Sequence, residues 1–123
     1  LKWLHRRYGE FAEENGYVRC EDPMTVSAIF RRLRDGGRYW TACGSYPVAW
    51  VRDLTEPGYD AETPDKRPQL PLLSAAGGGG GGGGEMLTFR LGGGAEGLVA
   101  TLRTSGTEPK IKYYMELRGE PGV

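Results

Sequence analysis

Hydrophobic and polar residues alternate along several short segments of the chain, and a two-residue period is typical of strands with one buried face. β-Branched and aromatic residues are frequent in the same segments, which strengthens the prediction. The turn-forming residues 92–97 join two of these segments as in an antiparallel meander. The predicted strands cover residues 16–21, 45–54, 85–91, 97–103 and 110–117.

One predicted strand, residues 45–54, carries apolar side chains on both of its faces. Regular alternation would place Val48 and Trp50 on one face, and Ala49 and Val51 on the other. We therefore expect both faces of this strand to be at least partly covered.

A helical period follows the first predicted strand. Asp22-Pro23 supplies an N-cap and a first-turn proline, and Gly36-Gly37 ends the segment. Apolar residues recur at i, i+3, i+4 and i+7, namely Val26, Ile29, Phe30 and Leu33. The helix also contains Arg31, Arg32 and Arg34, for which a solvated cationic face is favoured over a docking patch.

The order of these elements predicts an α+β fold, in which a helix packs on one face of an antiparallel sheet of about four strands. The chain has 123 residues, enough for one domain. Residues 1–14 are expected to be the end of a helix from a preceding domain, because the apolar residues Leu1, Leu4 and Tyr8 share a helical face. Residues 15–123 would then form the domain itself.

Two segments between the predicted strands have loop compositions. Residues 55–71 hold four prolines and many turn formers, and they are expected to form an ordered or semi-ordered loop. A run of eight glycines, 77–84, has no side chains to pack, so residues 74–85 are expected to form a flexible insert. A phosphate cradle is disfavoured there, because a strand and not a helix follows the run.

Composition limits the partners and the chemistry of the chain. Sixteen basic and sixteen acidic residues cancel, so we expect no nucleic-acid or membrane partner. Two cysteines and one histidine offer no plausible zinc set. Cys20 and Cys43 are expected to be buried, reduced thiols of a cytoplasmic protein. Any anion must be bound by a local cluster of charge.

The stretch RTSGTEPKIKYY, residues 103–114, provides such a cluster between two predicted strands. Thr104, Ser105 and Thr107 carry hydroxyls, and Gly106 can turn sharply and present its N–H group. Three cations flank this turn, namely Arg103, Lys110 and Lys112, and the two lysines are expected to point to the same side. An ordinary β-turn remains the alternative. Nucleotide hydrolysis is disfavoured, because no GxxxxGK[ST] loop is present.

RTSGTEPKIKYYMEL resembles the phosphate-binding loop of the C-terminal domain of the α-D-phosphohexomutase superfamily. The stretches YPVAWVRDLTEPGYD, PDKRPQLP and MLTFRL resemble the branch containing the phosphoglucomutase-2 type phosphopentomutase and glucose 1,6-bisphosphate synthase. The resemblance implies a fold like that of the TATA-binding protein, here truncated before its last helix. The glycine-rich residues 74–85 and 92–97 depart from the family pattern.

The resemblance also implies a reaction and a set of ligands. An enzyme phosphoserine would donate its phosphoryl group to a sugar phosphate, and the resulting sugar bisphosphate would reorient and return the other phosphate. The family's serine and its magnesium loop lie upstream, so no catalytic or metal-binding residue is expected here. The expected ligands of the non-reacting phosphate are Arg103, Ser105, Gly106, Thr107 and Lys112, with Thr104, Glu108 and Lys110 as second choices.

The resulting functional hypothesis is the substrate-phosphate-binding part of a cytoplasmic phosphosugar mutase. Its partners would be sugar phosphates, sugar bisphosphates and upstream domains of the same chain, and Mg²⁺ would bind outside this segment. Two alternatives stay open: an inactive fragment that binds sugar phosphates weakly, and an interaction protein with a low-complexity insert.

Overall fold

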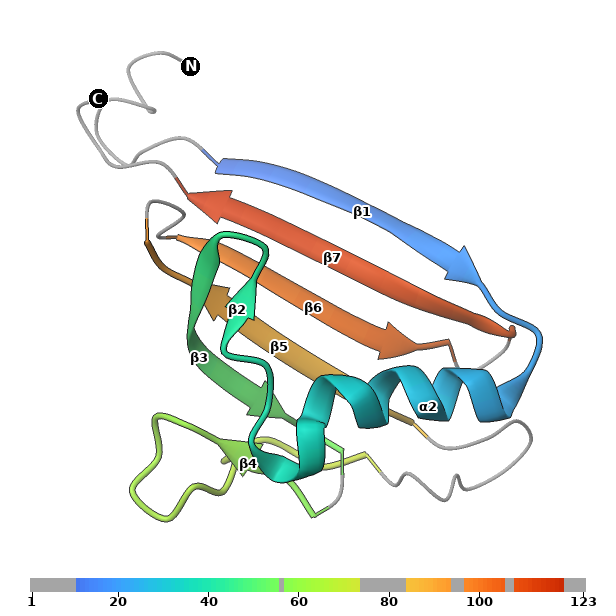
Figure 1. Ribbon diagram of the computed structural model, residues 1–123, viewed down its shortest axis with the longest axis horizontal. Coiled ribbons are helices and arrows are strands. Elements are labelled where there is room, and N and C mark those ends of the chain that lie inside the picture. Colours follow the sequence, from blue (N-terminus) through green and yellow to red (C-terminus); the bar gives the residue numbers. More distant parts are fainter. Residues whose placement is uncertain (1–10, 56, 74–83, 94–96, 106–107, 119–123) are drawn as a thin grey trace.

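The computed structural model describes residues 11–55, 57–73, 84–93, 97–105 and 108–118 of the chain. Six strands lie in the order β1-β7-β6-β5-β3-β2, β4 pairs with β3, and all these pairings are antiparallel (Figure 1). The elements are β1 (Phe11–Arg19), α2 (Pro23–Arg34), a 3₁₀ turn (Asp35–Gly37), β2 (Ala42–Cys43), β3 (Tyr46–Asp53), β4 (Tyr59–Asp60), β5 (Met86–Leu91), β6 (Leu98–Thr104) and β7 (Lys110–Arg118).

The sheet is larger than the sequence indicated. The α+β class is confirmed, but the expected number of about four strands is wrong, since the described residues form seven. β2 and β4 have two residues each, too few to show a period. Residues 11–14, expected at the end of a helix, belong to β1, because β1 pairs with β7 along its whole length. Residues 1–10 lie outside the described part, and the likeness to the TATA-binding protein stays a prediction.

Helix α2 begins and ends where its caps predicted. The Asp22 carboxylate accepts a 3.0 Å hydrogen bond from the Met24 N–H. Asp35 and Gly36 adopt left-handed backbone angles, with φ of 44° and 65°, and they end the helix. Phe30 is fully buried, whereas Ile29 is 37% exposed and does not join the core as its spacing suggested.

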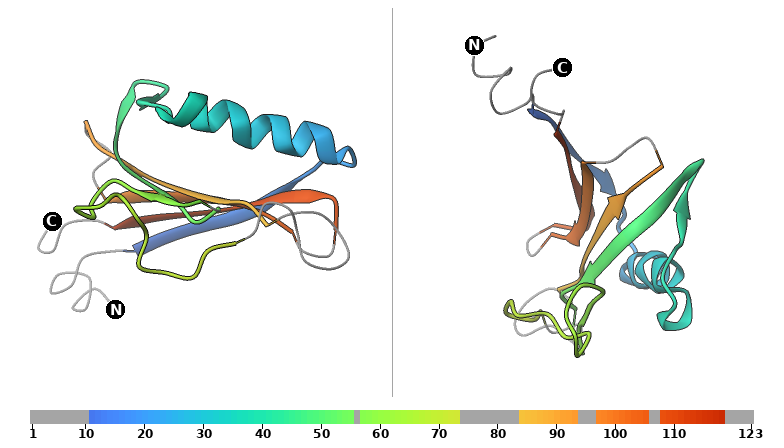
Figure 2. Two further views of the ribbon diagram at one scale, coloured as in Figure 1. Left: turned by 90° about the horizontal axis from the view of Figure 1, so that it is seen from below. Right: turned by 90° about the vertical axis from the view of Figure 1, so that its left-hand side faces the viewer.

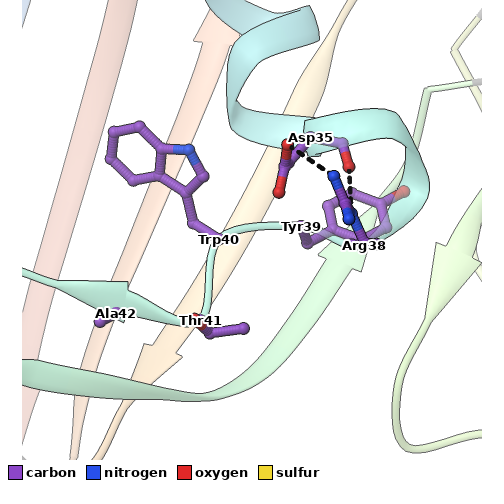
Figure 3. A pocket seen from close by; sticks show the side chains of 6 residues that line it. All are labelled: Asp35, Arg38, Tyr39, Trp40, Thr41 and Ala42. Carbon is purple, nitrogen blue, oxygen red and sulfur yellow. Dashed lines mark hydrogen bonds and ion pairs between the residues drawn. The ribbon is translucent and has the colours of Figure 1, made fainter.

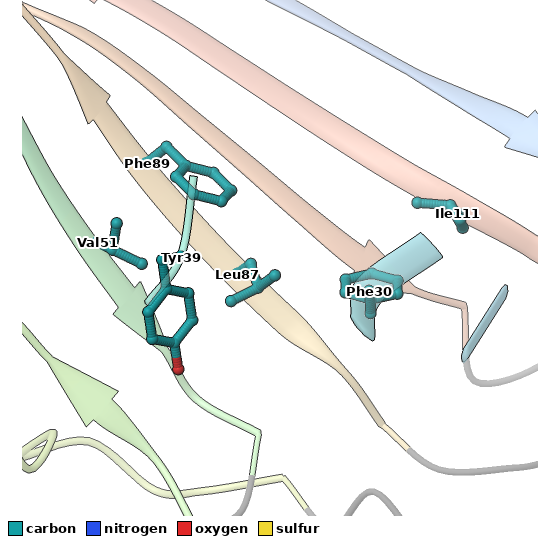
Figure 4. Close-up of a cluster of buried hydrophobic side chains, with 6 residues drawn as sticks. All are labelled: Phe30, Tyr39, Val51, Leu87, Phe89 and Ile111. Atoms are coloured by element: carbon teal, nitrogen blue, oxygen red, sulfur yellow. The ribbon is translucent and has the colours of Figure 1, made fainter. Parts of the chain in front are cut away.

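The core lies between α2 and one face of the curled sheet (Figure 2). Tyr39 is contributed by the segment after the helix, and its ring stacks on Tyr59 at 4.9 Å between centroids. Burial of these side chains is the main source of stability, since a fully buried large apolar side chain contributes about 1.5–3 kcal/mol. The buried cluster consists of Phe30, Tyr39, Val51, Leu87, Phe89 and Ile111 (Figure 4).

A β-bulge in β3 changes which side chains share a face. Val48 pairs with Leu91, but the next pair in the ladder joins Trp50 to Arg90, so the register shifts between them. Val48 therefore packs against the core together with Val51, and Trp50 lies on the opposite face. The prediction that Val48 and Trp50 share a face is wrong, because the extra residue reverses the alternation.

The loop that follows β3 is ordered across its described residues, as its turn composition allowed. It contributes β4 to the sheet, and the Asp60 N–H donates to the Lys66 carbonyl at 3.0 Å. Both cysteines are free thiols as expected, but their expected burial is wrong: Cys43 is exposed and Cys20 is half-buried. Among the described residues, no helix is both long enough and apolar enough to cross a membrane.

Candidate phosphate-binding site

The stretch singled out in the sequence forms the connection between β6 and β7. Arg103 and Thr104 are the last two residues of β6, and Lys110 is the first of β7. Gly106 and Thr107, two of the predicted ligands, lie outside the described residues. The strand-turn-strand context that the motif requires is therefore present.

Arg103 and Lys112 are direct partners across the β6–β7 ladder. Their neighbours Leu102 and Ile111 pack with the core, so Arg103 and Lys112 point to the opposite face of the sheet. Directly opposed side chains have Cβ atoms about 5 Å apart, and two like charges at that distance destabilise a sheet. An anion between the two side chains would remove this repulsion and gain two charge-assisted hydrogen bonds.

Lys110 lies on the same face as Lys112 but is already engaged. Its ammonium forms a 2.9 Å ion pair with Glu108 and sits 4.3 Å from the centre of the Tyr17 ring. The hydrogen bond from Lys110, and then its charge, lower the pKa of the Glu108 carboxyl below its ordinary value. Glu108 therefore stays ionised beside the cations and faces Lys110.

Thr104 and Ser105 form the base of the turn. The Thr104 N–H donates to the Glu85 carbonyl, and the Thr104 hydroxyl accepts from the Glu85 N–H, both at 3.0 Å. Ser105 is buried, its N–H donates to the Lys110 carbonyl at 3.0 Å, and its hydroxyl accepts from the Glu108 N–H at 3.3 Å. Strand pairing thus continues to the edge of the turn and holds its main chain.

A polar cluster on the helix side of the sheet touches this base, and sequence reasoning missed it. Arg34 at the end of α2 binds two acidic side chains, with 2.7 Å from Nε to Asp53 and 2.7 Å from an Nη atom to Glu85. Its other Nη atom donates to the Thr55 hydroxyl at 2.9 Å, and the Tyr39 hydroxyl donates to Asp53 at 2.9 Å. We call these five residues the Asp53 cluster.

The Asp53 cluster corrects two expectations. Arg34 does not belong to a solvated cationic face, because its side chain is 22% exposed and fully engaged. Burial alone would lower the pKa of Arg34, but the hydrogen bonds that it donates to Asp53 and Glu85, and the charges of these carboxylates, raise it. Glu85 was predicted to end a flexible insert, and instead it is buried and paired. The sequence contains no signal for this cluster, because Asp53 and Glu85 lie 19 and 51 residues from Arg34 along the chain.

Burial raises the pKa of the Tyr39 hydroxyl well above its ordinary value, and the charge of Asp53 adds to that effect. The phenol therefore stays protonated and donates to the carboxylate. The Asp53 cluster holds two carboxylates and one guanidinium, so it carries no cation to spare for a substrate phosphate.

Two hollows of the described surface lie away from the turn. One, of about 520 Å³, lies beside the segment that follows helix α2 (Figure 3). There the Arg38 guanidinium donates to the main-chain carbonyl and to the side-chain carboxylate of Asp35. Its lining residues are Asp35, Arg38, Tyr39, Trp40, Thr41 and Ala42. A second, of about 180 Å³, is lined by three glutamates, which would repel a phosphate. Neither hollow includes a predicted ligand.

No group of three or more His, Cys, Asp or Glu side chains within the described ranges could hold a metal ion. The sequence placed the Mg²⁺ of the family outside this chain, and that expectation remains a prediction.

Comparison with curated proteins gives clear relatives. Human phosphopentomutase is 42% identical over 125 aligned residues, which cover 99% of this chain and 18% of the relative. Mouse glucose 1,6-bisphosphate synthase is 41% identical with the same coverage, and a probable phosphoribomutase of Schizosaccharomyces pombe is 33% identical over 94% of the chain and 18% of the relative. No family model and no solved structure matches the chain.

The chain is homologous to a segment of the phosphosugar mutases, the class to which its turn motif pointed. Within that class its relatives are phosphopentomutases, glucose 1,6-bisphosphate synthases and phosphoribomutases, so the resemblance seen in the sequence is confirmed. The chain spans about a fifth of the length of these relatives.

Proposed function

We propose that this chain is the substrate-phosphate-binding part of a phosphosugar mutase that acts on pentose or hexose phosphates. The observation that carries the proposal is the cross-strand pair of Arg103 and Lys112 beside the turn of residues 104–109. Two cations face each other there, and the described part of the chain places no carboxylate within salt-bridge distance of either. A phosphate dianion matches this arrangement in charge and in geometry.

In the proposed reaction an enzyme phosphoserine exchanges its phosphoryl group with a sugar phosphate through a sugar bisphosphate. Arg103, Lys112 and the turn bind the phosphate that does not react, while Mg²⁺ elsewhere in the protein would stabilise charge on the group that is transferred. Binding a remote phosphate orients the sugar without selecting one hydroxyl, which a mutase requires because its substrate must react from both ends.

The relatives suggest that the chain needs further protein for catalysis, because it covers 18% of their length. We therefore propose that the 123-residue chain alone binds sugar phosphates weakly and has no mutase activity. A coupled assay with glucose 1-phosphate, glucose 1,6-bisphosphate and Mg²⁺ should give no turnover above the blank. Sustained metal-dependent turnover by the pure chain would contradict this part of the proposal.

The binding itself is tested by NMR titration of the chain with ribose 5-phosphate, glucose 1-phosphate and inorganic phosphate. The main-chain signals of Thr104, Ser105 and Lys110 should shift with all three, and glucose without a phosphate should leave them unchanged. Arg103→Ala should abolish the shifts. Arg32→Ala removes an equal charge from an exposed position of α2 and serves as the matched control. Equal weakening by both variants would show non-specific attraction and contradict the proposal.

A further inference from the structure

On the side of β5, the base of the proposed phosphate-binding turn is bonded to Glu85, the residue before that strand. The main chain of Glu85 forms two hydrogen bonds with Thr104. The Glu85 carbonyl accepts from the Thr104 N–H, and the Glu85 N–H donates to the Thr104 hydroxyl. Thr104 precedes Ser105, so the position of Glu85 sets where the turn leaves the sheet. In the sequence Glu85 follows eight glycines, which have no side chains with which to fix it.

The side chain of Glu85 supplies that fixation through Arg34. The guanidinium binds the Glu85 carboxylate at 2.7 Å, and its neighbouring nitrogen binds the Thr55 hydroxyl, which in turn accepts from the Met86 N–H at 3.0 Å. Met86, the first residue of β5, and Glu85, which precedes it, are thus connected to one side chain at the end of α2. Asp53 completes the arrangement by binding Nε at 2.7 Å, so the guanidinium plane is held from three sides.

The charges show that Arg34 acts indirectly. Its bonds are taken by Asp53, Glu85 and Thr55, and these lie on the helix side of the sheet, whereas Arg103 and Lys112 point to the opposite face. Loss of the guanidinium would leave two carboxylates close together with no cation between them, and their repulsion would push Glu85 outward. The shift would reach Thr104 through its two bonds to Glu85.

We propose that Arg34 is a positioning residue for the phosphate-binding turn, which it aligns through Glu85 and Thr104; the inference rests on the proposed function of that turn. In this proposal Arg34, at the end of α2, affects the affinity for substrate although it does not touch the substrate.

The chain contains a matched control for this inference. Arg52 forms a comparable partly buried ion pair with Asp60 at 3.0 Å, but that pair fixes the loop after β3 and not the turn. Arg34→Met and Arg52→Met should both lower thermal stability. Arg34→Met alone should raise the Kd for inorganic phosphate, about tenfold, at a temperature where both variants are folded.

Hydrogen exchange gives a readout that needs no ligand. In Arg34→Met the Thr104 amide should exchange at least tenfold faster, whereas the Asp60 amide, bonded to the Lys66 carbonyl, should keep its rate. In Arg52→Met the pattern should reverse. Arg34→Lys can reach one carboxylate and should restore about half of the lost affinity on a logarithmic scale.

The outcomes separate the two proposals. Unchanged phosphate affinity and unchanged Thr104 exchange in Arg34→Met would overturn the positioning role. Absence of phosphate binding by the unmodified chain would overturn the proposed function, and the exchange experiment would still decide whether Arg34 holds the turn. If Arg34→Met does not fold, Glu85→Gln weakens the same contact while it keeps both main-chain bonds, and it should accelerate Thr104 exchange in the same way.

Discussion

Two buried aspartates on opposite faces of the sheet have the same kinds of partner and different tasks. Each accepts from an arginine Nε, from an aromatic side chain and from a main-chain N–H two residues on. For Asp53 these are Arg34 (2.7 Å), Tyr39 (2.9 Å) and Thr55 (2.9 Å), and for Asp60 they are Arg52 (3.0 Å), Trp50 (3.1 Å) and Glu62 (2.9 Å).

The difference lies in how far the partners are apart in sequence. Arg34 and Tyr39 are 19 and 14 residues from Asp53, and Arg34 continues to Glu85, 51 residues away. The arginine and the tryptophan of Asp60 are 8 and 10 residues away, within β3 and the loop that follows it. The first cluster therefore joins the helix to the end of β3 and the beginning of β5, whereas the second fixes one loop to the sheet.

The largest effect is expected when each aspartate is replaced. Asp53→Ala should lower the free energy of unfolding by about 3–5 kcal/mol, because it breaks a buried ion pair and leaves the Tyr39 hydroxyl without its acceptor. Asp60→Ala should cost only about 1–2 kcal/mol, since the loop can open locally and Arg52 can turn to water. Urea unfolding measures both. Equal losses of unfolding free energy would show that the sequence separation of the partners does not decide how much each aspartate stabilises the fold.

A second difference should appear in phosphate affinity, and it ranks the residues of the turn. Arg103→Ala should be the most damaging, because it removes a planar bidentate donor, followed by Lys112→Ala. Ser105→Ala should cost about 1–3 kcal/mol, the range for hydrogen bonds to a charged group. Lys110→Ala should be mild, since Lys110 is paired with Glu108.

Isothermal titration with ribose 5-phosphate measures this ranking, and Asp60→Ala is the stability control. It should bind as the unmodified chain does, because the Asp60 contacts do not reach the turn. If Arg103→Ala and Lys110→Ala were equally mild, the ordinary β-turn interpretation of residues 103–112 would stand.

Acid should weaken the loop cluster. Burial alone would raise the pKa of Asp60, but hydrogen bonds from the Glu62 N–H, Arg52 and Trp50 and the charge of Arg52 lower it below the ordinary 3.8. A carboxylate with a lowered folded-state pKa contributes stability above pH 3.8, and this contribution is lost as the pH falls through the folded-state value. The stability difference between the unmodified chain and Asp60→Asn should thus shrink in acid. A constant difference from neutral pH to about pH 2 would contradict this assignment.

The sequence predicted what is encoded locally. Asp22 and Gly36 marked the ends of α2, and the motif at 103–112 marked the turn, because each signal lies within a few neighbouring residues. The bulge between Val48 and Trp50 could not be predicted, because pairing with β5 and burial of Trp50 decide it.

The environment of Arg34 was equally hidden, since the three arginines within residues 31–34 look alike until Asp53 and Glu85 approach one of them. Interactions that depend on the meeting of distant segments carry no period or spacing that a single sequence displays. The place of the turn between two strands could thus be predicted, but the contacts of Arg34 with Asp53 and Glu85 could not.

The smallest effect concerns Glu108, whose exposed ion pair with Lys110 is the counterpart of the two buried ones. The distance from the Glu108 carboxylate to the Lys110 ammonium is 2.9 Å, between the 2.7 Å of Arg34–Asp53 and the 3.0 Å of Arg52–Asp60. The Glu108 side chain is 62% exposed, however, and water and salt screen such pairs. Glu108→Gln should therefore leave the melting temperature unchanged, in contrast to Asp53→Ala. The same change removes a negative charge beside the proposed phosphate position and releases Lys110 on the Tyr17 ring. Affinity for inorganic phosphate should rise by about twofold to threefold at low salt, and the gain should vanish at high salt. A large loss of affinity would instead show that Glu108 braces the turn, and that its contact with Lys110 matters for shape more than for charge.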